Sequence, residues 1–376
     1  MLTNIANWCY NHHMETFTVT VTEMPGKVYG QYREGEIMTT IKDIARISGY
    51  SIGTVSRVIN NRADVSEEAR EKISEIIRER GYQPNSNARK LKQVISSEVS
   101  IIVRGNKNVF FESILEEIQI TMRGYDENIN VHFISETENE VATAVRIVSY
   151  IKPKGIIFLG GYIDNFRDEF SRINLPCVLA TAGAKDLGFE NLSSFTTDYY
   201  DAGKYAVNKL LSYGHTRIGI LGGYSANRSR EHKNGKIIGA VEALDRQGIT
   251  FDFDRDYEPC PYSAESGYEA AVRLLRRSPD LTAVFAISDL IALGAFRALK
   301  DIGRRVPEDV SVIGFDGLTY AKYSIPRLTT IRQDTGALAK KCVDDLLLRI
   351  TYGGPAVHEL IPYEFIEGES VAAVRQ

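Results

Sequence analysis

Three polar side chains that suit contacts with nucleic acid lie close together near the start of the chain: Thr54, Ser56 and Arg57. A guanidinium group can hold O6 and N7 of one guanine, and hydroxyl groups often donate to phosphate oxygens. The alternative for Arg57 is a phosphate contact or an exposed position on a helix. These residue types predict binding to DNA edges and backbone, and they do not suggest acid–base catalysis.

The elements that would position these residues are two short helices. A helical pattern of apolar residues from Ile41 to Ile47 is followed by a turn containing Gly49, and a second pattern runs over Ile52–Ile59. Ser51 is a natural N-cap for the second helix. A third helix is predicted to begin at about Ser66. Two amphipathic helices joined by a tight turn predict a helix-turn-helix.

Four motifs extend this pattern, and they are T-I-K-D-I-A at Thr40–Ala45, T-V-S-R-V-I-N at Thr54–Asn60, V-S-x-x-x-R-x-x-I at Val65–Ile73 and Y-x-P-N-x-x-A-R-x-L at Tyr82–Leu91. Together they closely resemble the DNA-binding headpiece of the lactose/galactose repressor (LacI/GalR) family. Tyr50 departs from the family pattern, which usually has a small aliphatic residue there, and we expect it to alter packing in the turn.

The resemblance implies which residues contact DNA. The recognition helix would begin at Ile52, which suits a thymine methyl group, and Gly53, which permits close approach, while Arg57 would contact a base. The expected phosphate anchors are Thr40, Ser51, Thr54, Ser56 and Asn60. Asn85 would open a hinge helix that forms on the operator, and Leu91 would wedge into the minor groove and kink the duplex.

Charge and cysteine content fit such a protein. Residues 38–96 hold eleven Lys and Arg and seven Asp and Glu, a net charge of +4, which leaves −8 for the rest because the whole chain carries −4. A basic segment on an acidic body is expected of a DNA reader. The four cysteines are far apart and form no CxxC pair, so we expect no disulfide and no zinc, as in a reducing cytoplasm. No apolar run is long enough to cross a membrane.

The first 37 residues show no clear periodicity and lack the basic start and apolar core of a secretory signal. Met38 stands where the headpiece of the family normally begins. The codons of Arg33–Ile37 must be purine-rich and would suit a ribosome-binding site. We hypothesise that translation starts at Met38 and that residues 1–37 come from an over-extended gene start. A genuine disordered arm is the alternative.

Beyond Leu91 the chain, which is long enough for two or three domains, alternates between strands and helices. The predicted buried strands are Val99–Val103, Asn130–Ile134, Gly155–Leu159, Cys177–Ala180, Arg217–Leu221, Ala283–Ile287 and Ser311–Phe315. The predicted helices are Ser113–Tyr125, Glu140–Tyr150, Tyr200–Tyr213, Lys236–Gln247, Ser266–Arg276, Leu290–Ile302 and Ala337–Tyr352. This alternation predicts doubly wound α/β architecture. A break near Ser193–Thr197 divides it into two lobes, with a ligand cleft at the carboxyl ends of the strands.

The family resemblance continues through this region. Its landmarks are Tyr213–Gly219, Ser288–Gly294, Pro307–Asp316 and Leu328–Asp334. The family's effector domain is similar to periplasmic sugar-binding proteins. The implied fold class is therefore α/β, with an N-terminal helix-turn-helix headpiece and a two-lobed, periplasmic-binding-protein-like, doubly wound effector domain.

The expected domain boundaries follow from this fold. After the extension at 1–37, the DNA-binding domain would cover residues 38–84 and the hinge helix and linker residues 85–96. Lobe 1 would combine 97–195 with 332–354, because the last helix returns to it. Lobe 2 would combine 196–331 with 355–376, and it would contain the final strand near Leu360–Ile366.

The resemblance also places polar and aromatic residues near the effector. Asp289, Asp316 and Gln333 match polar family positions whose oxygens and amide suit sugar hydroxyls. Asp289 is equally suited to cap the helix that follows it. Tyr262 matches a position where a ring covers the apolar face of a sugar. Phe111 follows the first strand and could line the cleft or pack in the core.

The basic effector ligand departs from the family pattern. Lys236 stands three residues before Gly239, where family members commonly have Arg, and lysine is a point charge and not a bidentate fork. Arg228 in the preceding loop could substitute. Gly160-Gly161 and Gly222-Gly223 follow strands but complete no nucleotide-binding motif. With no metal cluster or catalytic triad in view, we expect neither an enzyme nor a cofactor.

The resemblance thus implies a cytoplasmic, homodimeric transcriptional repressor that binds near-palindromic operator DNA and is released by a small molecule, for which we expect a sugar. Three alternatives remain open. One is a co-repressor-type regulator that binds a purine or a phosphorylated metabolite. The second is a solute-binding protein for transport, and the third is a nucleotide-dependent α/β enzyme.

Overall fold

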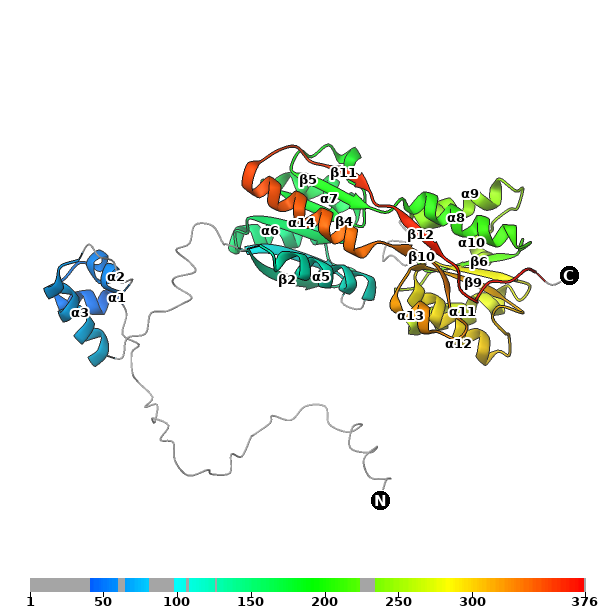
Figure 1. Cartoon of the computed structure of the whole chain (residues 1–376), viewed down its shortest axis with the longest axis horizontal. Helices are drawn as coiled ribbons and strands as arrows, with labels where there is room; N and C mark the ends of the chain where they lie inside the picture. The colour runs from blue at the N-terminus through cyan, green and yellow to red at the C-terminus, as the bar shows by residue number, and fades with distance from the viewer. Residues whose placement is uncertain are drawn as a thin grey trace, which may run out of the picture. The chain divides into compact units, whose positions relative to one another are not determined.

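A computed structural model of the chain describes residues 41–59, 65–80, 98–105, 108–125, 127–223 and 234–374. The chain divides into two compact units, Met1–Arg89 and Lys90–Gln376 (Figure 1), which contain the headpiece and the body respectively. The predicted start, hinge helix and several predicted contact residues lie outside the described residues, namely Met38, Thr40, Asn60, Asn85, Leu91 and Arg228.

The described part of the headpiece contains three helices, α1 (Ile41–Ser48), α2 (Ile52–Ile59) and α3 (Glu67–Glu79). They pack around a small core made by Ile44, Ala45, Val55, Val58 and Ile73, against which Tyr50 also packs. The expected cap is present, because Ser51 Oγ accepts a hydrogen bond from the Thr54 N–H (3.1 Å), and Ser66 Oγ caps α3 by accepting from the Ala69 N–H (3.4 Å). The predicted helix-turn-helix is confirmed.

Lobe 1 of the body is built on a six-stranded parallel sheet with the order β11-β5-β4-β3-β1-β2. Its strands are β1 (Glu98–Arg104), β2 (Asn128–Ile134), β3 (Gly155–Leu159), β4 (Cys177–Ala180), β5 (Leu192–Thr196) and β11 (His358–Leu360). Helices α5 (Val109–Met122) and α14 (Thr335–Tyr352) share one buried cluster with Ile157, and α6 (Glu140–Tyr150) and α7 (Ile163–Glu169) share another with Ile156. Successive strand residues point to opposite faces, so helices cover both faces of the sheet.

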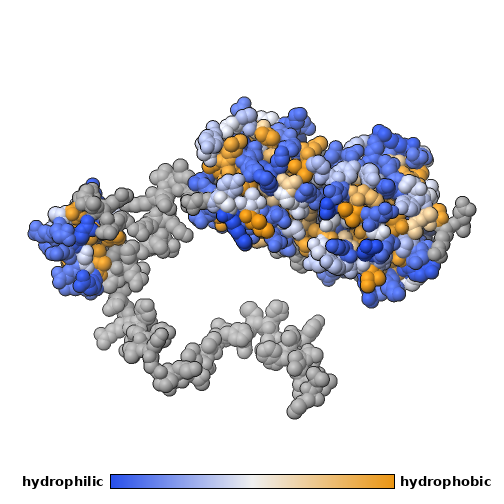
Figure 2. All heavy atoms as spheres, in the orientation of Figure 1, coloured by the Kyte–Doolittle hydropathy of each residue, from blue (hydrophilic) through white to orange (hydrophobic). Residues whose placement is uncertain are grey.

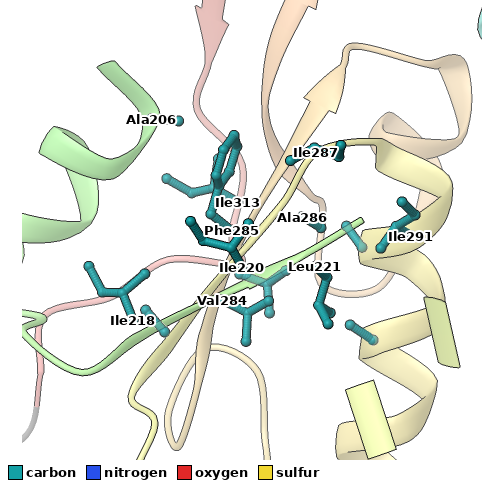
Figure 3. Packing of buried hydrophobic residues seen from close by; sticks show 14 of the residues in the cluster. Ala206, Ile218, Ile220, Leu221, Val284, Phe285, Ala286, Ile287, Ile291 and Ile313 are labelled. Atoms are coloured by element: carbon teal, nitrogen blue, oxygen red, sulfur yellow. The ribbon is translucent and has the colours of Figure 1, made fainter. Parts of the chain in front are cut away.

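Lobe 2 contains a second six-stranded sheet with the order β12-β10-β9-β8-β6-β7, in which only β12 is antiparallel to its neighbour. Its strands are β6 (Ile218–Leu221), β7 (Tyr257–Glu258), β8 (Ala283–Ala286), β9 (Ser311–Asp316), β10 (Thr329–Gln333) and β12 (Tyr363–Ile366). Its helices are α8 (Tyr199–Ser212), α9 (Gly235–Asp245), α10 (Phe253–Asp256), α11 (Ala264–Arg277), α12 (Asp289–Asp301) and α13 (Thr319–Tyr323). Figure 3 shows how Ile220, Phe285 and Ile313 from three adjacent strands pack together in its core. The predicted doubly wound α/β class is confirmed.

One predicted boundary is wrong. Residues 355–376 were assigned as a whole to lobe 2, but β11 pairs with β5 in lobe 1. The Ser194 N–H donates to the Val357 carbonyl (2.8 Å), and Ser194 Oγ lies 2.8 Å from His358 Nδ1. The single strand expected near the end of the chain is therefore two strands, one in each lobe. The chain consequently crosses between the lobes three times, after β5, after β10 and after β11.

Helices α8 and α9 cross unusually closely in lobe 2. A Cβ atom on Gly239 would lie 1.9 Å from the carbonyl oxygen of Tyr200, and one on Gly203 would lie 2.1 Å from that of Lys236. Only glycine permits this separation. The crossing therefore sets the position of the first turn of α9, which carries Lys236. None of the helices in the described parts of the chain is long and apolar enough to cross a membrane.

Candidate functional site

The second helix of the headpiece presents the predicted DNA-contacting side chains on one face. Ile52 is 45% exposed and Arg57 is also exposed, whereas Val55 and Val58 on the opposite face are buried in the headpiece core. Thr54 is half-buried, and its hydroxyl lies 2.9 Å from that of Ser51. Helix α2 therefore has the arrangement that a recognition helix requires, and the individual base and phosphate contacts stay predictions.

The body holds a cavity of about 360 Å³ whose wall comes from both lobes. Its residues follow the carboxyl ends of β1, β3 and β4 in lobe 1 and of β6 and β9 in lobe 2, which is the usual ligand-binding edge of such sheets. Four of the predicted effector residues line it: Phe111, Lys236, Tyr262 and Asp316. The topology thus brings together residues that are more than 200 positions apart in the chain.

A buried ion pair lies on the lobe 2 wall. Lys236 and Asp316 are 6% and 4% exposed, and Lys236 Nζ lies 3.6 Å from Asp316 Oδ1. The ammonium group also donates to the Ile287 carbonyl (3.0 Å) and lies 3.8 Å from the centre of the Phe315 ring. Burial lowers the pKa of Lys236 and raises the pKa of Asp316, while the attraction between the two charges opposes both shifts. The pair offers one cationic donor and one anionic acceptor to a ligand.

Backbone strain is concentrated at this cavity. In the described parts of the chain, three residues other than glycine have positive φ, namely Lys152, Thr181 and Asp316. Thr181 (φ 70°) and Asp316 (φ 107°) both line the cavity. Such conformations persist only where the surroundings hold them, and they cluster at functional sites.

Two predicted effector residues do not line the cavity. The carboxylate of Asp289 is wholly buried, where it accepts hydrogen bonds from the Leu318 N–H (2.6 Å) and Thr330 Oγ1 (2.6 Å). Asp289 does not cap helix α12 either, because the cap position is Ser288. Its role is to tie the loop after β9 to β10, and burial raises its pKa. This assignment to the effector is therefore corrected.

Gln333 supports the cavity indirectly. Its amide Nε2 donates to Asp316 Oδ1 at 2.9 Å, and the side chain is 4% exposed. Gln333 thereby holds the carboxylate of Asp316 at the cavity wall without lining the cavity itself.

Most lobe 1 residues of the cavity were not predicted, among them Arg104 and Tyr162. Arg104 ends β1, and its guanidinium carbon lies 3.8 Å from the centre of the Tyr162 ring. The same guanidinium forms a 2.5 Å ion pair with Glu140. The partners are 36 residues apart and on different elements, so no local pattern links them. The position of Tyr162, directly after a buried strand and two glycines, was the signal that could have drawn attention to it.

Fold and site together define a DNA-binding regulator with a ligand-binding body, and comparison with known proteins agrees. Residues 40–85 match the model for bacterial regulatory proteins of the lacI family, and residues 207–371 match that for a periplasmic binding protein-like domain. The HTH-type transcriptional regulator MalR of Clostridium butyricum is 33% identical over 349 residues, which cover 88% of this chain and 98% of MalR. The chain belongs to the LacI family of transcriptional regulators and is not an enzyme.

Two solved structures are similar over both units. The complex of the transcriptional regulator CelR with cellobiose is 28% identical with a TM-score of 0.63, and the match covers 88% of this chain and 99% of CelR. The lac repressor dimer bound to operator and the anti-inducer ONPF is 25% identical with a TM-score of 0.65, and the match covers 89% and 99% of the two chains.

Proposed function

We propose that this chain is a cytoplasmic repressor that binds operator DNA as a homodimer and is released when a small sugar occupies the cavity of the body. The observation that carries the proposal is the cavity, in which the buried Lys236–Asp316 pair and the aromatic side chain of Tyr262 face one space. An ammonium group, a carboxylate and a ring together suit hydroxyl groups and the apolar face of a sugar. The cellobiose bound by CelR supports the same choice of ligand.

DNA binding would follow the arrangement of the family. Helix α2 would enter the major groove with Arg57 and Ile52 toward base edges, and the headpieces of two protomers would reach successive major grooves. Leu91 would wedge into the minor groove at the operator centre, where the cost of unstacking is offset by wider contact with bent DNA. The lac repressor dimer bound to its operator supports this mode for the present chain.

A homodimer is supported by apolar side chains that the single chain leaves uncovered. Tyr320 and Tyr323 of α13 are 54% and 73% exposed, and Ile325 directly after this helix is 95% exposed. Figure 2 shows hydrophobic residues at the surface of the body among hydrophilic ones. Exposed apolar side chains that cluster in one segment mark interaction surfaces, and a two-fold axis would let the same segment of both protomers meet.

The three segments that cross between the lobes supply a route from ligand to DNA. A ligand that contacts both walls of the cavity favours one arrangement of the lobes over another. Because β1 begins directly after the predicted hinge, a change of lobe 1 would alter the geometry available to the hinge helices. The effect of the sugar on operator affinity is then a coupling between two distinct sites.

The test is an operator-binding assay by fluorescence anisotropy, with the DNA upstream of the neighbouring genes and a panel of sugars. Asp316→Ala should bind the operator like the parent but fail to release it when the active sugar is added. Leu91→Ala should bind the operator more weakly and bend it less. Asp245→Ala, which removes an exposed carboxylate from the same lobe, serves as the control. Release of Asp316→Ala at the parent's sugar concentration, or tighter operator binding on ligand addition, would contradict the proposal.

A further inference from the structure

Tyr162 forms part of the lobe 1 wall of the cavity, and its ring is held in place by Arg104. It follows Gly160-Gly161 at the carboxyl end of β3. The guanidinium of Arg104 lies over its ring, with 3.8 Å between the guanidinium carbon and the ring centre. This cation covers one face of the ring, and both side chains line the cavity.

The groups that hold Tyr162 are themselves fully engaged. Arg104 donates to the carboxylate of Glu140 (2.5 Å) and to the backbone carbonyls of Glu138 (3.2 Å) and Glu136. Glu140 in turn accepts from the backbone N–H of Tyr162 (2.6 Å) and from the side chain of Asn165 (3.0 Å). Arg104 and Glu140 are 7% and 0% exposed. This buried ion pair therefore orients the ring, and the guanidinium is already neutralised.

Gly160 brings a second ring to the same wall. A Cβ atom at this position would lie 2.7 Å from ring carbons of Phe111, and the residue has a φ of 79°. The absent side chain lets the ring of Phe111 lie against the turn after β3. The glycine pair thus makes room for aromatic side chains, and its presence after β3 does not require a phosphate-binding role. We call Phe111 and Tyr162 together the aromatic shelf.

The charges of the cavity wall, as far as the described residues form it, disfavour an anionic ligand. Among the described residues that line it, the cations are Arg104, which is paired with Glu140, and Lys236, which is paired with Asp316. Glu136 and Asp164 add two more carboxylates to the wall, and Asp164 is paired with Arg167 at 2.9 Å. A phosphate group would find both cations of the wall already paired and would face carboxylates, whereas hydroxyl groups can donate to the carboxylates. The volume of about 360 Å³ lies at the lower end of small-molecule sites.

We propose that the ligand is an uncharged disaccharide, with one ring bound by Lys236 and Asp316 on lobe 2 and the second stacked on the aromatic shelf of lobe 1. Tyr162 determines the specificity for the second ring, and Arg104 and Glu140 are its positioning residues. An aromatic face suits the apolar C–H face of a sugar. The inference rests on the proposed function for the identity of the cavity as the effector site.

The test is calorimetric titration of the full chain, without DNA, with cellobiose, maltose, glucose, glucose 6-phosphate and hypoxanthine. At least one disaccharide should bind more tightly than all other compounds. Tyr162→Ala should weaken this disaccharide about tenfold, equivalent to about 1.4 kcal/mol, and leave the affinity for glucose unchanged. Tyr162→Phe should bind like the parent. Tyr150→Ala, which removes an exposed tyrosine of the same lobe, is the matched control.

The positioning role is tested with Arg104→Lys, which keeps the charge but loses the planar fork over the ring. This variant should lower the affinity for the disaccharide relative to the affinity for glucose, and it should leave the affinity for glucose 6-phosphate unchanged. Thermal unfolding of each variant shows whether it is folded, and Tyr162→Leu replaces Tyr162→Ala if the alanine variant is not.

Tightest binding by glucose 6-phosphate or hypoxanthine, absence of disaccharide binding, or equal losses for disaccharide and glucose in Tyr162→Ala would each overturn the inference. Because DNA is absent, these outcomes are independent of the repressor mechanism. A chain that binds a disaccharide but keeps its operator would contradict the proposed function alone, and one released by a sugar phosphate would contradict the inference alone.

Discussion

Replacement of Gly239 by alanine is expected to lower the free energy of unfolding. A Cβ atom there would lie 1.9 Å from the carbonyl oxygen of Tyr200, and real Cβ contacts lie above 3.0 Å. Helix α9 must therefore move away from α8 by roughly 1 Å. Overpacking by one methyl group costs about 1–3 kcal/mol, and the better helix propensity of alanine offsets about 1 kcal/mol of that. Because the carbonyl of Tyr200 belongs to the backbone and cannot rotate away, we expect the overpacking cost to lie near the upper end of that range. The free energy of unfolding should then fall by about 2 kcal/mol.

The same displacement should reach the effector site. Lys236 lies in the first turn of α9, and its Nζ is 3.0 Å from the Ile287 carbonyl and 3.6 Å from Asp316. A hydrogen bond is lost once the distance exceeds about 3.5 Å, so a shift of about 1 Å disconnects the ammonium group from that carbonyl. The affinity for the sugar that releases the parent should fall about tenfold, which is the equivalent of one such contact.

Urea denaturation followed by circular dichroism measures the first effect, and calorimetric titration measures the second. The control is Gly336→Ala in α14, where the new Cβ would meet no atom nearer than 3.6 Å. This variant should be more stable by about 0.4–1 kcal/mol and bind the sugar like the parent. Parent-like unfolding and parent-like affinity in Gly239→Ala would refute the reasoning.

Two further predictions concern the headpiece and the pH response. Arg57→Ala should cost about 1–3 kcal/mol of operator binding and relax the preference at one base pair per half-site, whereas a uniform loss across all DNA sequences would assign Arg57 to a phosphate. His215 Nε2 donates to the Ala372 carbonyl at 2.9 Å, and burial lowers the pKa of this histidine. As the pH falls, His215 is therefore protonated in the unfolded chain before it is protonated in the folded chain. The folded state consequently loses stability below about pH 6.5. Urea denaturation at several pH values measures how steeply the free energy of unfolding depends on pH, and His215→Gln should reduce this dependence. The part that remains is due to His132 and His358, whose pKa values burial also lowers. An unchanged pH dependence in His215→Gln would contradict the prediction.

The secondary structure was predictable where apolar residues form long local runs. The bounds of β3, β4 and α6 agree with the expectation from the sequence, because each is a continuous apolar run or a regular helical stripe. The two-residue strand β7 and the short helix α13 had no such signal, since so few residues show no period. The pairing of β11 with lobe 1 depends on where the chain returns in space, which no local pattern records.

The cavity was predictable only in part, and for the same reason. Lys236 and Asp316 could be predicted because each belongs to a local family motif beside a strand or helix. The contact between Arg104 and Tyr162 arises from the pairing of β1 with β3, so it exists only in the folded sheet. Asp289 was misassigned because its carboxylate accepts a hydrogen bond from the N–H of Leu318, and this contact forms only after the loop beyond β9 has folded back.

The late return of the chain to both lobes constrains the order in which the body can fold during synthesis. Lobe 1 lacks its edge strand and the helix α14 until the ribosome has passed Leu360, and lobe 2 lacks β12 until Ile366. Both lobes therefore stay incomplete until nearly the end of synthesis, although the first strand of lobe 1 begins at Glu98. A nascent chain of this protein therefore exposes unpaired sheet edges in both lobes at once, and a C-terminal truncation that removes β11 and β12 would damage both together.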